Sequence, residues 1–206
     1  MIRVCFDLDL KVWRCQPKIL SSLHHGYILV VMVEVEFVPF NTDLHMKELH
    51  EMHIEYMTWV INELDKTYQI DTQAMMGVSI QEVVDNSIGS FMSLKPPDGI
   101  LLIAQVDGKI VGTGALKRLG DGLGEIKRMY NRPQFRGLGV GKQMLNRLLE
   151  AGREYGYTSF MLDTPKWAYA AQHIYRSVGF EEVEEYPESE IPTDFRQYWM
   201  FMKKKE

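Results

Sequence analysis

The sequence predicts an α/β (α+β) fold in which a mixed central sheet of six to seven strands has helices on both faces. The first observation is a two-residue Asp107-Gly108 turn between two alternating apolar runs, which is a strong β-hairpin signal. The second is the order of the later segments. Strands followed by strand, helix, strand, helix and two more strands imply a mixed sheet that is covered on both faces.

Periodicity and end signals predict the individual elements. Glu34 to Phe40 alternates acidic and apolar residues like a half-buried strand, and Asn41, Thr42 or Asp43 can cap the helix that follows. Ser79 is expected to cap a second helix. The expected helices are 44–66, 79–94, 142–155 and 167–178, and the expected strands are 34–40, 100–106, 109–116, 125–131, 158–163, 180–186 and 195–203.

Length and composition limit the class of protein. The chain has 206 residues, of which 46% are hydrophobic and 25% charged, as expected for one globular domain with or without an extension. A net charge of -5 argues against general nucleic-acid binding, which needs a concentrated basic surface. No apolar run approaches the roughly twenty residues that span a bilayer, and Cys5 and Cys15 indicate no disulfide framework. We therefore expect a cytoplasmic protein that binds neither nucleic acid nor membrane.

The first 31 residues show no sustained periodicity, and we expect a single domain at residues 32–206. Residues 1–31 would then be an N-terminal extension that is disordered or is translated from a start codon upstream of Met32. The alternative is that Tyr27 to Val33 extends the first strand of the domain.

Two polar segments do not have the spacing of a functional motif. His50 and His53 lie three residues apart, unlike the H-E-x-x-H of a zinc helix. We expect these two histidines and His45 to be solvated or to line a groove, and we expect no metal. The acid-rich run 181–190 is expected to be solvated surface.

The most informative stretch runs from Gly124 to Gly141 and reads as a strand, a tight glycine turn and the start of a helix. Pro133 cannot donate to a ladder and ends the strand. The first N–H groups of a helix lack intrahelical acceptors, and the macrodipole favours a phosphate there. Gly137, Gly139 and Gly141 remove side chains that would keep a pyrophosphate away.

Two other phosphate-binding motifs fit this stretch less well. A Walker A loop needs four residues before its Gly-Lys pair and then Ser or Thr, whereas here three intervene and Gln143 follows Lys142. A dinucleotide fingerprint needs a small residue where Lys142 stands and a turn that follows its strand directly. Asp163 would supply the acid of that fingerprint, so a nucleotide-dependent oxidoreductase stays a distant alternative.

The segment Gln134-Phe135-Arg136-Gly137-Leu138-Gly139 resembles the Q/R-x-x-G-x-G/A signature with which the GNAT superfamily of N-acetyltransferases binds the pyrophosphate of coenzyme A. A Glu-Ile-Lys-Arg-Met-Tyr strand precedes it, and the family-like segment Ala171 to Phe180 follows at the usual distance. The resemblance covers most of the chain from about Val33 onward. It implies the GNAT fold and acetyl coenzyme A as co-substrate, without a metal.

The resemblance also implies the residues of the cofactor site. Main-chain groups of Met129, Tyr130 and Asn131 would face the thioester and the pantetheine arm, with a donor near Met129 facing the oxyanion. Asn131 departs from the family, which usually has Val there, and we expect the change to be tolerated because the contact uses main-chain atoms. The pyrophosphate would be bound by Gln134, Arg136, Gly137, Leu138, Gly139, Val140, Gly141 and Lys142. A basic cleft for the phosphates would come from Lys127, Arg128, Arg132, Arg136 and Lys142.

Two side chains match catalytic positions of the superfamily. Tyr175 corresponds to the tyrosine that gives a proton to the departing thiolate, and its alternative role is that of a core aromatic. Glu125 corresponds to a glutamate that some members use as general base, directly or through water. Its alternative role is that of a structural partner of Lys127. We expect Asp163 to be a structural acid at a strand end rather than the base.

Together these inferences predict an N-acetyltransferase that moves an acetyl group from acetyl coenzyme A to a primary amine by direct transfer. The alternative is a non-catalytic acyl coenzyme A-binding sensor or partner module of the same fold. The acceptor would be a small-molecule amine or a protein amine, and Tyr68, Met75 and Met76 would border it or fill gaps in the core. A homodimer through the last strands is a further expectation.

Overall fold

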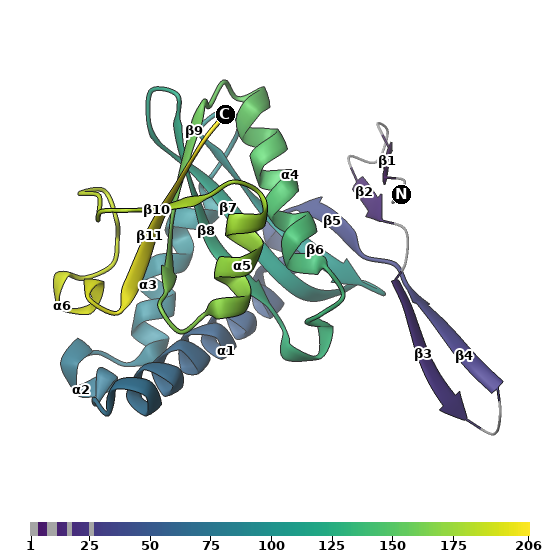
Figure 1. Ribbon diagram of the computed structural model, residues 1–206, viewed down its shortest axis with the longest axis horizontal. Helices are drawn as coiled ribbons and strands as arrows, with labels where there is room; N and C mark the ends of the chain where they lie inside the picture. The colour runs from purple at the N-terminus through teal and green to yellow at the C-terminus, as the bar shows by residue number, and fades with distance from the viewer. Residues whose placement is uncertain (1–3, 8–11, 16–17, 25–26) are drawn as a thin grey trace.

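The computed structural model describes residues 4–7, 12–15, 18–24 and 27–206 (Figure 1). Within these residues the main sheet has the strand order β1-β2-β5-β6-β7-β8-β9-β11-β10. Only β8 and β9 pair in parallel, so the sheet is mixed. The strands are β1 Val4–Asp7, β2 Val12–Cys15, β5 Glu36–Pro39, β6 Gly99–Val106, β7 Lys109–Gly120, β8 Leu123–Asn131, β9 Ser159–Pro165, β10 Glu181–Val183 and β11 Trp199–Lys205.

The seven strands from β5 to β11 confirm the predicted mixed sheet, and β1 and β2 add to it at the β5 edge. Two further strands, β3 Lys18–His24 and β4 Tyr27–Val33, form a separate hairpin. The segment Tyr27–Val33 therefore pairs with β3 and does not extend β5. The proposal that residues 1–31 are an extension stays a prediction, and residues 1–3, 8–11, 16–17 and 25–26 lie outside the described residues.

Helices cover both faces of the sheet, as predicted (Figure 1). On one face α1 (Thr42–Tyr68) and α3 (Ile80–Met92) pack on β6 and β7, and on the other lie α4 (Val140–Glu154) and α5 (Tyr169–Ser177). The alternation of β6 explains this arrangement. Leu101 and Ile103 pack with Leu49 and Met52 of α1, whereas Leu102 and Ala104 pack with residues of α4.

Local end signals place the first two long helices where the sequence predicts them. The side chain of Asn41 accepts a hydrogen bond from the Leu44 N–H at 3.2 Å and caps α1. Ser79 and Glu82 form a capping box, since the Ser79 N–H donates to Glu82 Oε2 at 2.8 Å and Ser79 Oγ accepts from the Glu82 N–H at 3.2 Å.

Two short helices were not predicted. Between α1 and α3 the chain forms α2 (Thr72–Met76), whose N-cap Asp71 accepts from the Ala74 N–H at 2.9 Å. The predicted strand 195–203 begins only at Trp199, because α6 (Thr193–Arg196) follows Pro192. Proline has a backbone angle that suits a helix start, and this local preference outweighs the apolar pattern.

Two irregularities of β8 open the sheet. Lys127 faces Ala115 and Tyr130 faces Thr113, so three steps along β8 oppose two along β7 and form a bulge. Arg128, inside the bulge, has a φ of 54°, and its carbonyl accepts a hydrogen bond from Thr113 Oγ1 at 2.9 Å. Moreover, β8 pairs with β9 only from Leu123 to Ile126, although both strands continue. The two strands therefore separate at their carboxyl ends.

In the part of the chain that the structure describes, none of the helices combines the length and apolar character that crossing a membrane requires.

Candidate functional site

The start of α4 offers exposed backbone donors. Its N-cap, Gly139, has a φ of 83°, and no side chain caps the helix. Gly137 has a φ of 76°, and a Cβ built on it would meet nothing within 4 Å. The surface around this turn is therefore open, and Lys142 is exposed on the first helical turn. This is the arrangement that favours an anion at a helix N-terminus.

Gly141 has a different role from the one predicted. It is buried, and a Cβ on it would lie 2.8 Å from the side-chain nitrogen of Asn131. With its amide oriented to satisfy both neighbours, Asn131 accepts from the Gly141 N–H at 3.0 Å and donates to the Tyr130 carbonyl at 3.1 Å. One N–H of the turn is thus used by the protein itself, and Gly141 permits close packing rather than ligand access.

The predicted basic cleft does not form as a single cluster. Arg132 is bound by two carboxylates of α1, Glu48 at 2.9 Å and Glu55 at 3.0 Å. The Arg136 guanidinium lies over the Trp59 ring, 5.0 Å from its centroid. Among the predicted cations, Arg132 therefore connects β8 to α1, whereas Lys127 and Arg128 line a cavity.

A cavity of about 550 Å³ lies where β8 and β9 separate. Its wall comes from α1, α2, α3, α5, the two strands and the segment that follows β10. It contains Met129, Tyr175, Met75 and Met76, as the sequence suggested, but neither Glu125 nor Tyr68. The remaining lining residues are Tyr56, Met57, Trp59, Val60, Ile61, Leu64, Thr72, Val78, Val83, Ser87, Ile126, Lys127, Arg128, Asp163, Thr164, Pro165, Ala168, Ala171, Glu190, Ile191, Pro192, Asp194, Phe195 and Trp199.

Tyr175 reaches the cavity from α5 and is 5% exposed. Its ring packs edge-on against Phe180, with the centroids 6.0 Å apart. Burial raises the pKa of the Tyr175 hydroxyl well above its usual range, and the nearby Tyr56 and Asp163 add to the rise. The hydroxyl therefore keeps its proton at neutral pH, which is the state of a proton donor.

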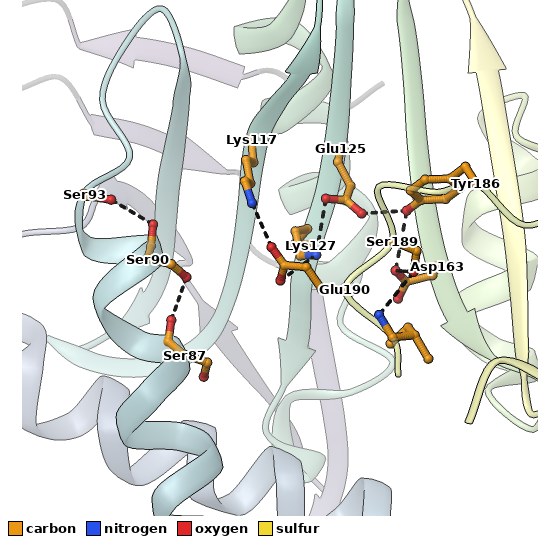
Figure 2. A network of polar contacts seen from close by, with 11 residues as sticks. Ser87, Ser90, Ser93, Lys117, Glu125, Lys127, Asp163, Tyr186, Ser189 and Glu190 are labelled. Carbon is orange, nitrogen blue, oxygen red and sulfur yellow. Dashed lines mark hydrogen bonds and ion pairs between the residues drawn. The ribbon is translucent and has the colours of Figure 1, made fainter. Parts of the chain in front are cut away.

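Glu125 lies inside a polar network rather than at the cavity wall (Figure 2). Its side chain is fully buried, the Tyr186 hydroxyl donates to Oε1 at 2.6 Å, and Lys127 Nζ lies 3.2 Å from Oε2. Burial raises the pKa of Glu125, although Lys127 and the Tyr186 hydroxyl oppose the rise. Both sequence-based roles thus remain open, because the glutamate is a partner of Lys127 and is also joined to the cavity through it.

Asp163 and Glu190 are the carboxylates of this network that line the cavity, and Asp163 is the more buried of the two. Its Oδ2 lies 3.5 Å from the Tyr186 hydroxyl and accepts from Ser189 Oγ at 3.3 Å. Burial raises the pKa of Asp163, while Lys127 and the Ser189 hydroxyl lower it. The sequence predicts a structural acid at this strand end but does not reveal its partners, because Tyr186 and Ser189 come from a segment that is distant in the chain.

Glu190 fixes the segment that closes the cavity. Its carboxylate is 2.7 Å from Lys117 Nζ and 3.0 Å from Lys127 Nζ, and Figure 2 shows Lys127 between Glu125 and Glu190. Although burial raises the pKa of Glu190, the two lysines lower it to about 2. The expectation that the run 181–190 is solvated surface holds for Glu190, whose side chain is 42% exposed, and is wrong for Tyr186 and Ser189, which are each 7% exposed.

The histidines of α1 are mostly structural. His45 and His53 are 6% and 3% exposed, so neither is solvated, and neither lines the cavity, whereas His50 lies 2.7 Å from Asp85. Burial lowers the pKa of His53 to about 4, and the nearby Arg128 and His50 lower it further. Within the described residues, no group of three or more His, Cys, Asp and Glu side chains is placed to hold a metal ion.

Comparisons with known proteins agree with this geometry. A model of the acetyltransferase (GNAT) family matches residues 46–180. An uncharacterized N-acetyltransferase of Schizosaccharomyces pombe is 34% identical over 120 residues, 57% of this chain and 74% of the relative. The IAA acetyltransferase of Azospirillum brasilense is 32% identical over 98 residues, which are 47% of this chain and 64% of the relative. The N-acetylaspartate synthetase of Rattus norvegicus is 33% identical over 91 residues, which are 44% of this chain and 30% of the relative.

Solved structures share the fold at lower identity. An acetyltransferase from Streptococcus agalactiae has a TM-score of 0.61 and 20% identity, and the match covers 84% of this chain and 98% of the other. A PaiA N-acetyltransferase from Thermoplasma acidophilum, solved in complex with coenzyme A, has a TM-score of 0.60 and 18% identity. The match covers 84% of this chain and 99% of the other.

Proposed function

This chain belongs to the GNAT family of acetyltransferases, and from that premise we propose that it moves an acetyl group from acetyl coenzyme A to a primary amine by direct transfer. One observation carries the proposal. The end of β8 leads through the glycine turn to the uncapped start of α4, and Met129 of the same strand lines the cavity where β8 and β9 separate, which suits a long ligand with an anionic end and a reactive end.

The residues around α4 fit coenzyme A. Gly137 and Gly139 have left-handed backbones and place no side chains at the turn before α4, and the exposed Lys142 adds a positive charge. When bound, acetyl coenzyme A supplies an activated acetyl thioester. We propose that main-chain groups of Met129, Tyr130 and Asn131 hold its arm and that a donor near Met129 faces the thioester oxygen. The pyrophosphate would contact Gln134, Arg136, Gly137, Leu138, Gly139, Val140 and Lys142.

The acceptor amine must be neutral before it can attack, because an unperturbed lysine-type ammonium has a pKa of about 10.4. We propose that Asp163, at the cavity wall, receives the proton. The Tyr186 hydroxyl joins Asp163 to Glu125, so both carboxylates belong to the base of this site. Tyr175, which carries its proton at neutral pH, then gives that proton to the departing thiolate.

The proposal is tested by measuring thiol release from acetyl coenzyme A in the presence of separate pools of amino acids, polyamines, aminoglycosides and peptides. Release that depends on one pool and falls in Tyr175→Phe would establish amine acetylation through this site. Saturable binding of acetyl coenzyme A without release from any pool would contradict it and favour a non-catalytic acyl coenzyme A-binding module. A cytoplasmic location and a homodimer through the last strands are further proposals, tested by fractionation and by sedimentation.

A further inference from the structure

The bulge of β8 places two successive cations on one cavity wall. In a regular strand neighbouring side chains point to opposite faces, so only one of Lys127 and Arg128 would face the cavity. The inserted residue changes this alternation, and both residues line the cavity. A backbone in the left-handed region costs free energy for a residue with a side chain, and Arg128 adopts it with a φ of 54°.

The two cations have different surroundings. Lys127 lies within 3.2 Å of Glu125 and within 3.0 Å of Glu190, so its charge is balanced inside the protein. Arg128 brings a guanidinium to the same cavity as the Asp163 carboxylate, and its charge is close enough to lower the pKa of Asp163. Its Nε atom is buried. The cavity therefore presents a cation and an anion to one ligand.

The rest of the acceptor side is mainly apolar. Helices α1 and α2 and the segment after β10 contribute aliphatic, sulfur-containing and aromatic side chains, which would exclude water from a bound apolar group. These residues are Val60, Ile61, Leu64, Met75, Met76, Phe195 and Trp199.

We propose that the acceptor is a free amino acid with an apolar side chain, whose carboxylate binds Arg128 while its amine faces Asp163. This inference rests on the proposed function and names its substrate class. A guanidinium recognises a planar carboxylate through two parallel hydrogen bonds, and the amine that attacks would then lie beside the group that takes its proton. A polyamine, a lysine side chain or the N-terminus of a longer peptide has no carboxylate next to its amine and cannot use Arg128 in this way.

The test compares matched acceptors. Initial rates are measured for L-phenylalanine, L-phenylalaninamide and phenethylamine, and for leucine, methionine and tryptophan with their amides. We expect kcat/KM to be about 10- to 100-fold higher for each amino acid than for its amide, as for a hydrogen bond to a charged group. The α-amine of an amino acid amide is less basic than that of the free amino acid, so a larger fraction of it is neutral at pH 7. A preference for the free amino acid therefore cannot come from the reactivity of its amine.

The variants Arg128→Gln and Arg153→Gln assign the preference to a residue. Arg128→Gln should abolish the preference for the carboxylate by lowering the rate of the amino acids more than that of the amides. A change in the pKa of Asp163 would affect both acceptors alike, so the ratio of the two rates is the readout. Arg153, on the far end of α4, is paired with Glu206 at 2.9 Å and serves as the matched control, which should keep the preference. Equal rates for amino acid and amide, or a preference that survives in a folded Arg128→Gln, would overturn the inference.

A binding measurement separates this inference from the proposed function. In the presence of coenzyme A, N-acetyl-L-phenylalanine should bind at least 10-fold more tightly than N-acetyl-L-phenylalaninamide in wild type, and equally in Arg128→Gln. If no amine is acetylated, the proposed function fails, whereas the binding preference still decides whether Arg128 recognises a carboxylate. Equal binding of the two ligands to wild type would overturn the inference that Arg128 recognises a carboxylate.

Discussion

The change Tyr175→Phe removes one hydroxyl group from the wall of the cavity. The ring keeps its edge-on contact with Phe180, so the variant should unfold within a few degrees of wild type. Burial holds the pKa of the hydroxyl above its usual range, so every molecule carries this proton at neutral pH. The substitution therefore removes the full contribution of the hydroxyl as a general acid. Loss of a general acid typically costs about 100- to 10,000-fold, or about 3 to 5 kcal/mol of activation free energy.

The assay is the initial rate of thiol release at saturating acetyl coenzyme A, with coenzyme A affinity and thermal unfolding measured in parallel. Tyr169→Phe is the matched control, because Tyr169 lies on the same helix but is 75% exposed. Since Tyr175 does not titrate near neutrality, its loss should lower the pH–rate profile without changing its shape. A rate within about threefold of wild type would refute the role of Tyr175 as an acid, as would an equal loss in coenzyme A affinity.

Three further changes test the cofactor turn, the core and the closing segment. Gly139→Asp should weaken acetyl coenzyme A binding about 10-fold or more, as measured by titration calorimetry. Gly156→Asp is the matched control, because Gly156 has a similar φ of 85° at the other end of α4, and it should leave this binding unchanged. Gly152→Ala should lower the free energy of unfolding in urea by about 1 to 3 kcal/mol, because a Cβ would collide with a phenylalanine ring of β9. Gly89→Ala is the control on α3, where the space is open, and it should raise the same free energy by about 0.5 to 1 kcal/mol. The lowered pKa of Glu190 contributes stability that is present above its ordinary value and is lost as the pH falls towards about 2. Because the side chain is 42% exposed, Glu190→Gln should cost at most about 1 kcal/mol at pH 7 and nothing near pH 2, and a cost that does not change with pH would contradict this ion pair.

The features that the sequence predicted depend on neighbouring residues. Asn41 and Ser79 cap helices through atoms three residues away, and the Asp107-Gly108 turn takes the left-handed angles that its residues favour. The glycine turn before α4 is likewise local, since its glycines at 137 and 139 both have positive φ. For such features the physical cause lies within the same short segment, so reading the sequence is enough.

The features that the sequence did not predict depend on contacts between distant segments. Arg132 was expected near a phosphate, but two carboxylates of α1 bind it, 77 and 84 residues earlier in the chain. Tyr186 and Ser189 were expected to be solvated with the rest of the acid-rich run, but they are buried against Glu125 and Asp163, 61 and 26 residues earlier in the chain. The sequence position of a charged side chain does not reveal its partner, and the burial of the pair decides how strongly it affects stability.

The end of the parallel pairing between β8 and β9 locates the candidate site more sharply than any motif. The last paired residues are Ile126 and Leu162, and the next residues on the two strands, Lys127 and Asp163, both line the cavity. While the strands are paired, their backbone groups bond to each other and their side chains fill the core; once they separate, the same backbone groups can bind a ligand. A charged residue directly after an apolar strand run is therefore informative, and Asp163 after Phe160 to Leu162 is such a residue. The bulge then adds Arg128 to the same edge, so that the opening of the sheet and the opposite charges that we assign to acceptor binding lie at a single interruption of the sheet.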